Sequence, residues 1–475
     1  MFLSELLQDI KVLSQYTDRE ITDVTDKTGK VSSGCAFVCI KGARFDGHSA
    51  AADMLEKGAA AVIVTQDLGL KEQVIVENAR EAYALMCKNY FGRAADKLKI
   101  IGITGTNGKT TTAFIVKDIL KKLNIESGLI GTVKNMVGDE EFAAEYTTPD
   151  PYDMHALFKM MSDRGIGCCV METSSQAFHQ MRLAGITFVS GIFTNLTQDH
   201  LDYHGTIEEY KRCKKMLFLN CEKAVVNADD EAAAYMVDGI DVPVMKYSLK
   251  NPSDIKASDA EYSQKKVSYT LNGEYGVDFY IPGSFSVYNS LAAISAVYSL
   301  GVASLEDIAA AAAFAKSVKG RVELLDTDTP YAVIIDYAHT PDGLEKAITA
   351  VRGFTKGRVI TVFGCGGDRD KTKRPKMGRT ATELSDVAVI TTDNPRTEDP
   401  GEIIKDIIIG TVGCRAEVVT VTDRSEAIEY AMSIAKEGDT VLLAGKGHET
   451  YQIIGTEKHH YDEREVVKAV LEKRG

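Results

Sequence analysis

A glycine-rich segment stands between an expected strand and an expected helix. It reads IIGITGTNGKTTTAFIVKDIL over residues 100–120. Gly105 and Gly108 allow backbone amides to turn toward phosphate oxygens. Lys109 can neutralise the β- and γ-phosphates, the Thr110 hydroxyl can ligate Mg²⁺, and the helix N-terminus adds the positive end of its dipole. The match to G-x-x-x-x-G-K-[ST] is imperfect, because the first glycine, Gly102, stands one place early. We predict an ATP site formed by Gly105, Thr106, Asn107, Gly108, Lys109, Thr110 and Thr111.

A lysine on an apolar helix face is a second chemical candidate. Thr206 and Glu209 form a T-x-x-E capping box that predicts a helix start. At about 100° per residue, one apolar stripe follows, made of Tyr210, Cys213, Leu217, Phe218 and Cys221. Lys214 falls in the middle of this stripe. Such a lysine usually reaches solvent or meets a carboxylate. The alternative is a lysine with a lowered pKa that is chemically modified.

Four ionisable residues precede this helix: Asp199, His200, Asp202 and His204. Their types suit a metal or catalytic site. They suit a hydrogen-bonded polar loop equally well, so the residues alone leave both interpretations open.

A mainly parallel sheet has to position these residues. Apolar strands alternate with helical patterns, which is typical of βαβ units. Strands are expected at 36–40, 60–64, 74–76, 100–104, 168–173, 188–195 and 224–228, and then at 332–336, 358–364, 387–392, 417–421 and 440–445. Alternation around Asn272-Gly273 predicts a hairpin over 267–281. A helix is expected from Ser290 to Leu300, ending at Gly301.

The chain length predicts about three domains. We expect an α/β fold with an amino-terminal domain over 1–97, a central domain over 98–318 and a doubly wound domain over 319–475. Polar residues 92–99 and the pair Lys319-Gly320 mark the two boundaries.

Composition excludes several classes of protein. The formal charge of −13 argues against nucleic acid or an anionic membrane as a partner. The nine cysteines include no CxxC pair, so we expect reduced core thiols. The amino terminus lacks the basic start and apolar run of a signal peptide, and no apolar stretch approaches the roughly 18 residues of a membrane span. We expect a soluble, cytoplasmic enzyme.

Ordered motifs along the whole chain are similar to those of Mur ligases, specifically the UDP-N-acetylmuramoyl-tripeptide synthetase branch. The motifs are GTNGKTT at 105–111, TTPD at 147–150, METSS at 171–175, TNLTQDHLDYHGT at 194–206, VYN at 287–289, GR at 320–321, DYAHTPDGL at 336–344, FGCGGDRDKTKRP at 363–375, DNPR at 393–396 and GKGHE at 445–449.

The resemblance implies a three-domain Mur ligase architecture with a central P-loop ATPase-like domain and a Rossmann-like carboxyl-terminal domain. It implies that ATP and Mg²⁺ convert the D-glutamate γ-carboxylate of a UDP-linked muropeptide into an acyl phosphate, which an amino acid then attacks. Lys214 matches the family's carbamylated lysine, whose CO₂ adduct helps to hold Mg²⁺. Glu172 and His200 match the other metal-associated positions, beside Thr110.

The resemblance also assigns the remaining binding positions. Asn289, Arg321 and Asp336 match residues that hold the nucleotide, and ATP would bind between domains. Thr28 falls on the uridine side of the UDP-linked substrate. Matches to contacts with the muropeptide arm are Thr147, Thr148, Ser174 and Arg182. The family implies a monomer.

The DNPR form of its motif resembles the enzymes that add meso-diaminopimelate. The planar fork of Arg396 suits the second carboxylate of that amino acid, which L-lysine lacks. The other matched amino-acid contacts are Arg369, Asp393, Asn394, Pro395, Gly445 and Glu449, with Glu449 suited to an ammonium group.

Two departures from the family pattern stand in the sequence. Thr28-Gly29 replaces the usual Ser-Arg, and Gln176 replaces a frequent histidine. Three rival readings are a ligase of the same branch that adds lysine or another diamine, a folylpolyglutamate synthetase, and a non-catalytic nucleotide-binding scaffold. A folylpolyglutamate synthetase lacks the uridine domain and the DNPR and GKGHE pair. A scaffold should have lost at least one of Lys109, Glu172, His200 and Lys214, and all four are present.

Overall fold

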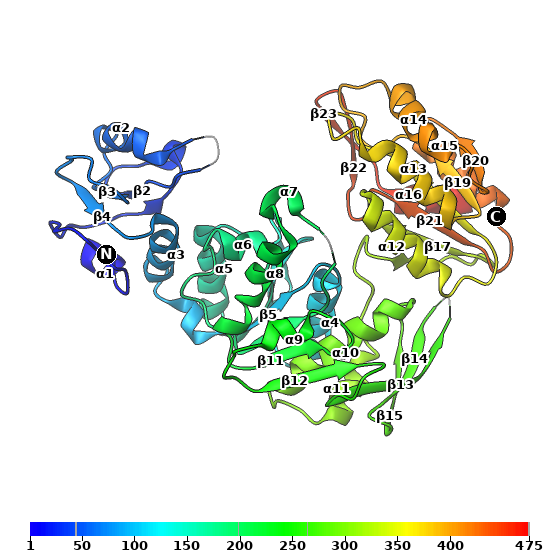
Figure 1. Ribbon diagram of the computed structural model, residues 1–475, viewed down its shortest axis with the longest axis horizontal. Coiled ribbons are helices and arrows are strands. Elements are labelled where there is room, and N and C mark those ends of the chain that lie inside the picture. The colour runs from blue at the N-terminus through cyan, green and yellow to red at the C-terminus, as the bar shows by residue number, and fades with distance from the viewer. Residues whose placement is uncertain (43–44, 198, 264, 474–475) are drawn as a thin grey trace. The chain divides into compact units, whose positions relative to one another are not determined.

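The computed structural model describes residues 1–42, 45–197, 199–263 and 265–473 (Figure 1). The chain divides into two compact units. The first comprises residues 1–255 with 291–308, and the second comprises residues 256–290 with 309–475. Helix α10 (Ser284–Ser299) and helix α11 (Leu305–Ala312) each contribute residues to both units. No helix in the described part of the chain is long and apolar enough to cross a membrane.

The first unit begins with a small parallel sheet in the order β1-β2-β3-β4. Alternate residues of its central strands face opposite sides. Val38 and Ile63 pack in a core with Tyr83 of α3, whereas Phe37 and Val62 pack in a core with Met54 of α2. The elements are β1 (Val24–Thr25), β2 (Ala36–Val38), β3 (Ala61–Val64), β4 (Gln73–Ile75), α1 (Leu3–Leu6), α2 (Ala51–Glu56), α3 (Ala79–Tyr90), and the 3₁₀ turns η1 (Thr28–Lys30), η2 (Gly47–Ala50) and η3 (Ala94–Lys97).

A larger sheet of the first unit runs in the order β12-β11-β10-β5-β9-β6-β7-β8. The pairs from β12 to β6 are parallel, and β7 and β8 add an antiparallel edge. The strands are β5 (Lys99–Thr104), β6 (Gly128–Ile130), β7 (Asn135–Val137), β8 (Glu140–Phe142), β9 (Cys168–Glu172), β10 (Ser190–Phe193), β11 (Ala224–Asn227) and β12 (Val244–Ser248). The helices are α4 (Lys109–Lys122), α5 (Pro151–Asp163), α6 (Ser175–His179), α7 (Leu201–His204), α8 (Ile207–Lys215), the 3₁₀ turn η4 (Phe218–Asn220) and α9 (Ala233–Val237).

The second unit contains a doubly wound sheet in the order β16-β17-β21-β18-β19-β20. All its pairs are parallel except β16 with β17. Helices α12, α13 and α14 contribute to the core on one face of the sheet, and α15 and α16 to the core on the other. The strands are β16 (Glu323–Leu324), β17 (Ala332–Asp336), β18 (Val359–Phe363), β19 (Val387–Ile390), β20 (Glu417–Thr420) and β21 (Thr440–Ala444). The helices are α12 (Pro341–Arg352), α13 (Lys373–Leu384), α14 (Pro400–Ile408), η5 (Ile409–Thr411), α15 (Arg424–Ile434) and α16 (Glu463–Glu472).

Two antiparallel elements complete the second unit. Strands β14 (Val267–Leu271) and β15 (Tyr275–Phe279) form the expected hairpin around Asn272-Gly273, and β13 (Ile255–Tyr262) pairs with β14. Strands β22 (Tyr451–Ile454) and β23 (Glu457–His460) form a second hairpin after the GKGHE segment.

The buried parallel strands confirm the α/β fold class, and several local expectations need correction. Helix α10 starts at Ser284, six residues before the expected Ser290. Thr206 does cap α8 by accepting a hydrogen bond from the Glu209 amide (3.2 Å). The Glu209 carboxylate bonds to Arg212 at 2.7 and 2.8 Å, so only the Thr206 half of the capping box forms. All nine cysteines are free thiols; eight are buried, as predicted for core cysteines, and Cys414 is partly exposed.

Candidate active site

The glycine-rich loop follows β5, a strand buried between β9 and β10. Gly105 (φ 146°) and Gly108 (φ 84°) turn the chain into α4. A Cβ at Gly105 would lie 1.9 Å from the Thr194 Oγ1 atom, so this position requires glycine. Lys109 Nζ donates to the carbonyl oxygens of Gly105 (2.9 Å) and Thr106 (3.0 Å), which holds its charge over the loop. The turn at the two glycines and the position of Lys109 suit a loop that binds phosphate groups.

Glu172 joins the end of β9 to this loop. Its carboxylate is fully buried and accepts hydrogen bonds from the Thr110 hydroxyl (2.9 Å) and from the Thr132 amide (2.9 Å) and hydroxyl (3.1 Å). It forms no ion pair with any described residue. A buried carboxylate is costly without a compensating charge, so Thr110 and Glu172 together fit a divalent cation.

Lys214 lies on the buried face of α8. Its Nζ atom donates to the Gly105 carbonyl (2.7 Å) and lies 4.3 Å from the centre of the Tyr210 ring. The Tyr210 hydroxyl in turn donates to Thr106 Oγ1 (3.2 Å), so a hydrogen bond joins α8 directly to the glycine-rich loop, called the phosphate loop below. Burial, reinforced by the charge of Lys109, holds the pKa of Lys214 well below its ordinary value. The lysine neither reaches solvent nor pairs with a carboxylate in the described part of the chain, so the lowered-pKa interpretation fits.

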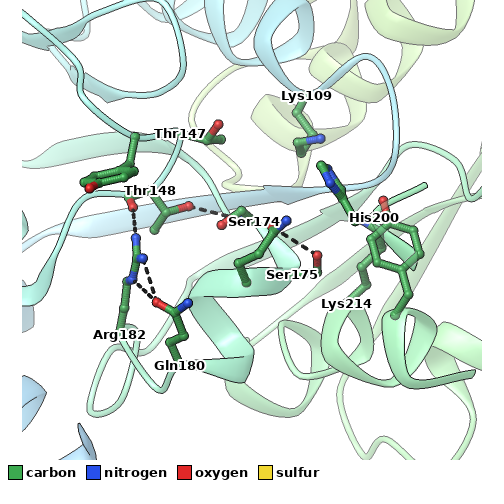
Figure 2. Close-up of a pocket in the computed structure, with 12 residues that line it drawn as sticks. Lys109, Thr147, Thr148, Ser174, Ser175, Gln180, Arg182, His200 and Lys214 are labelled. Atoms are coloured by element: carbon green, nitrogen blue, oxygen red, sulfur yellow. Dashed lines mark hydrogen bonds between the residues drawn. The ribbon is translucent and has the colours of Figure 1, made fainter. Parts of the chain in front are cut away.

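A cavity of about 310 Å³ connects these groups with the expected muropeptide-arm residues (Figure 2). Figure 2 shows Lys109, His200 and Lys214 at one end and Gln180 and Arg182 at the other. The lining residues are Lys109, Tyr146, Thr147, Thr148, Ser174, Ser175, Gln176, Gln180, Arg182, His200, Tyr210 and Lys214.

Thr148 organises the end of the cavity farthest from Lys109. Its hydroxyl donates to the Glu172 carbonyl (2.9 Å) and accepts from the Ser174 amide (3.0 Å). Arg182 Nη1 donates to the Thr148 carbonyl (2.9 Å), and its guanidinium lies 5.2 Å from the centre of the Tyr146 ring. Ser174 caps α6 through the Ala177 amide. Thr147 is within 3.0 Å of the Thr132 hydroxyl.

His200 and Thr28 are placed less tightly. His200 (φ 51°) is half exposed, and its Nε2 atom lies 3.6 Å from an Asp199 oxygen. The side chain of Asp202 lies outside the described residues. Thr28 is partly buried in η1, between Lys27 and Lys30. These two lysines line a separate cavity of about 380 Å³ together with Tyr83, Asp150 and other residues, and Thr28 is not part of its lining.

In the second unit, the carboxyl ends of β18, β19 and β21 bring the FGCGGDRD, DNPR and GKGHE segments together. These strands are neighbours, and this edge is where doubly wound sheets bind ligands. Arg396 adopts φ 52° and donates from Nη1 to the Gly367 carbonyl (2.9 Å). A Cβ at Gly366 would lie 2.9 Å from Arg396 Nη1 and 3.7 Å from Arg369 Cγ. Neither guanidinium forms an ion pair with another described residue, so both can receive a carboxylate.

Acidic and amide groups face the same edge. Asp393 and Asn394 are buried, and Asn394 Nδ2 donates to Glu449 Oε2 (3.0 Å). Gly445 has φ 118°, and a Cβ there would lie 2.6 Å from Asp393 Oδ2. Pro395 is buried beside Arg396. Glycine at position 445 therefore leaves room for the buried Asp393 carboxylate, which a Cβ would displace.

Two expected nucleotide residues lie at the end of β17. The oxygens of buried Asp336 accept from the amides of Val322 and Ala338, both at 2.8 Å. Burial raises the pKa of Asp336, and the charge of Arg321 opposes that shift. The Arg321 guanidinium lies 5.2 Å from the centre of the Tyr337 ring. Asn289, the third expected residue, is buried in α10.

Several residues in and beside the first cavity were not predicted from the sequence. Gln180 Oε1 accepts from Arg182 Nε (2.9 Å) and Nη2 (2.6 Å), and Tyr146 covers the same guanidinium. Thr132 holds the Glu172 carboxylate. The position of Gln180, two residues before the expected Arg182, could have indicated its role. Thr132 lies outside every motif. Gln176, a departure from the family pattern, also lines the cavity.

Comparison with known proteins decides the family. Residues 103–297 match the Mur ligase middle domain, residues 320–447 match the Mur ligase glutamate ligase domain, and residues 20–89 match the Mur ligase family catalytic domain. The chain is 45% identical to the UDP-N-acetylmuramoyl-L-alanyl-D-glutamate–2,6-diaminopimelate ligase of Clostridium perfringens, over 99% of this chain and all of the relative. The chain belongs to the Mur ligase family. The protein of the same name from Geobacillus kaustophilus is 43% identical over 94% of both chains.

Solved structures agree with this membership. A structure named as a UDP-N-acetylmuramoyl-L-alanyl-D-glutamate–2,6-diaminopimelate ligase has a TM-score of 0.74 and 29% identity, covering 100% of this chain and 99% of the other. Another Mur ligase, from Thermotoga maritima in complex with ADP, has a TM-score of 0.61 and 19% identity, covering 95% and 98% of the two chains. A folylpolyglutamate synthase from Mycobacterium tuberculosis has a TM-score of 0.59 and 18% identity, covering 76% of this chain and 91% of that one. It shares the fold alone.

Proposed function

We propose that this Mur ligase uses ATP to join meso-diaminopimelate to the D-glutamate γ-carboxylate of UDP-MurNAc-L-Ala-D-Glu in peptidoglycan synthesis. One observation carries the proposal most directly. A single cavity is lined by Lys109 of the phosphate loop, by Lys214, and by the expected muropeptide-arm residues Ser174 and Arg182. Full-length relatives at 45% and 43% identity, both named for this reaction, support the same reading.

The first chemical step would be phosphoryl transfer. A γ-carboxylate oxygen attacks the γ-phosphorus of ATP, the new O–P bond forms as the bond to ADP breaks, and an acyl phosphate results. The ammonium of Lys109 and the amides around Gly105 and Gly108 face the charge that develops on the transferring group. Catalysis then rests on positioning and electrostatics, because no protein nucleophile is needed.

The second step would form the amide. The amine of the incoming amino acid attacks the acyl carbon, loses a proton, and the tetrahedral intermediate expels inorganic phosphate. Arg182, held by Gln180 and Thr148, would fix the muropeptide arm so that its carboxylate stays at the Lys109 end of the cavity. Fixing both partners in this way lowers the entropic part of the barrier.

We assign Mg²⁺ to Thr110 and Glu172, with His200 and a carbamate on Lys214 as further contributors. Mg²⁺ would neutralise charge on the phosphates. The buried, ion-pair-free carboxylate of Glu172 supports this assignment. Carbamylation requires a neutral amine, which the lowered pKa of Lys214 favours, and Lys214 is one of the residues that line the cavity.

We assign the amino-acid site to the three strand ends of the second unit. Arg369 and Arg396 would bind carboxylates, and Asp393 and Glu449 would bind an ammonium group. Arg321, Asp336 and Asn289 are proposed to contact ATP, and Thr28 to lie on the uridine side. The domain boundaries at 97/98 and 318/319, a cytoplasmic location and a monomeric state are also proposals, based on the family.

Mass spectrometry of the reaction product tests the function. With ATP, Mg²⁺, the UDP-linked dipeptide and meso-diaminopimelate, we expect a UDP-linked tripeptide with loss of one water relative to its two components. Lys109→Met should abolish the product while the protein keeps its melting temperature. A wild-type enzyme that forms no tripeptide with any diamino acid would contradict the proposal.

A further inference from the structure

Lys446 is a fully buried cation near the proposed amino-acid site. Its side chain has no exposed surface. Nζ donates to Asn394 Oδ1 (2.7 Å) and to the Tyr451 carbonyl (2.9 Å). One lysine therefore ties the GKGHE segment to the DNPR segment and to the start of β22.

The bonds to Asn394 fix the orientation of its amide. Its Oδ1 atom accepts two donors, Lys446 Nζ and the Ile453 amide (2.9 Å). The opposite end, Nδ2, is therefore directed to Glu449 Oε2 (3.0 Å). Were the amide reversed, Nδ2 would face both donors and Oδ1 would face a carboxylate, which is repulsive on both sides. Lys446 thus sets the position of the Glu449 carboxylate through Asn394.

The charges around Lys446 also favour the binding of an ammonium group at this site. Lys446 Nζ lies 3.6 Å from Glu449 and 3.9 Å from Asp393. The neighbouring Arg424 is neutralised by its own buried partner, Glu463 (2.8 Å). Two carboxylates around one ammonium leave one negative charge without a partner. Asp393 Oδ2 is buried and accepts no hydrogen bond from any described residue. An incoming ammonium group would satisfy both shortages.

We infer that Lys446 is a positioning residue for the amino-acid substrate: through Asn394 it holds Glu449, and with it Asp393, in place to receive a substrate ammonium group. It does not touch the reacting atoms. This inference rests on the proposed function, since it assumes that the strand ends of the second unit bind the amino acid.

Steady-state ADP release tests the inference, with the diamino acid varied at saturating ATP and UDP-linked dipeptide. For Lys446→Met we expect KM for the amino acid to rise about tenfold or more, because a hydrogen bond to a charged group and its alignment are lost. The kcat value and KM for ATP should change by less than about threefold. Lys458→Met removes an exposed lysine from nearby β23 and is the matched control, with all constants unchanged.

Asn394→Ala provides a second variant, which adds no charge and removes both the acceptor for Lys446 and the donor to Glu449. It too should raise KM for the amino acid. Because both changes interrupt one chain of bonds, the double variant should be no worse than the worse single variant.

An unchanged KM in Lys446→Met, or effects of the two changes that multiply, would overturn the inference. The comparison uses whichever diamino acid the wild-type enzyme accepts. A wild-type preference for lysine would therefore overturn the proposed substrate without deciding the role of Lys446.

Discussion

At the scale of single residues, two buried ionisable groups stand out in the first unit, Glu172 and Lys214. Among the described residues, Glu172 forms no ion pair with a cation and Lys214 forms none with a carboxylate. Such groups destabilise a fold unless something compensates them. Both lie beside the phosphate loop, where a metal ion and a carbamate would compensate them together.

Lys214→Met should stabilise the unliganded protein in a pH-dependent way. The pKa of Lys214 is lower in the folded protein than the ordinary value of 10.5. Between these two pKa values the unfolded chain binds the extra proton, so stability falls as the pH falls from 10.5 toward the folded-state pKa. The Lys214→Met variant does not suffer this loss of stability, because it has no amine to protonate. In bicarbonate-free buffer, its melting temperature should exceed that of the wild type at pH 7, and the difference should narrow as the pH approaches 10.

The same variant should lose activity by about 100-fold or more, as expected for a group that organises transition-state charge. Lys211→Met, on the same helix but off the buried stripe, should stay within about twofold of the wild type. Equal losses in both variants, or a stability difference that does not depend on pH, would contradict the role given to Lys214.

Gln180→Leu should weaken binding of the muropeptide substrate. Gln180 holds the Arg182 guanidinium through two hydrogen bonds at 2.9 and 2.6 Å. Without them the arginine keeps its bond to the Thr148 carbonyl but is oriented less firmly, so KM for the UDP-linked dipeptide should rise about fivefold or more. KM for ATP should not change. A fall in kcat with no change in either KM would show that Gln180 acts elsewhere.

At the scale of elements, close helix packing holds the amino-acid loops of the second unit. Helices α13 and α14 approach so closely that a Cβ at Gly378 would lie 2.2 Å from the Ile407 carbonyl oxygen. Arg374, at the start of α13, is fully buried and binds both Glu398 (2.9 Å) and Asp406 (2.9 Å). Since Glu398 also accepts from the Asp368 amide, this packing fixes the loop that carries Arg369.

Gly378→Ala should therefore destabilise the protein, although alanine normally favours a helix by about 1 kcal/mol over glycine. Overpacking against the backbone of α14 should cost about 1–3 kcal/mol. Gly353→Ala is the control, since the nearest atom to its added Cβ lies at 3.5 Å. Chemical denaturation measures both. A more stable Gly378→Ala variant would mean that α13 and α14 are less tightly packed than described.

The sequence predicted most of the elements that position the site, because buried parallel strands are continuous apolar runs. The strand ends that carry Glu172, Asp336 and Asp393 followed directly from these runs. Short strands such as β6 and the edge strand β8, and the hairpin β22–β23, carry no such pattern. Two further details depend on which of several local contacts forms. They are the early start of α10 at Ser284 and the pairing of Glu209 with Arg212. The hydrogen bond from Asn394 to Glu449 depends on tertiary contacts that spacing cannot reveal.

At the scale of the whole molecule, each of the two compact units carries its own set of residues proposed to bind substrates. The first unit holds the glycine-rich loop and the cavity proposed for the muropeptide arm, and the second holds Arg396, Asp393 and Glu449. The resemblance and the relatives name one reaction that needs both sets. The choice of amino acid is therefore the property that tests the proposed side-chain contacts and the proposed reaction together.

The most direct test measures ADP release with the UDP-linked dipeptide, ATP and Mg²⁺, offering meso-diaminopimelate or L-lysine in separate reactions. The proposed function predicts a strong preference for meso-diaminopimelate in the wild type. In Arg396→Ala that preference should fall by about 10-fold to 100-fold, because the second carboxylate loses its charged partner. A wild-type preference for L-lysine, or an Arg396→Ala variant with unaltered preference, would contradict it.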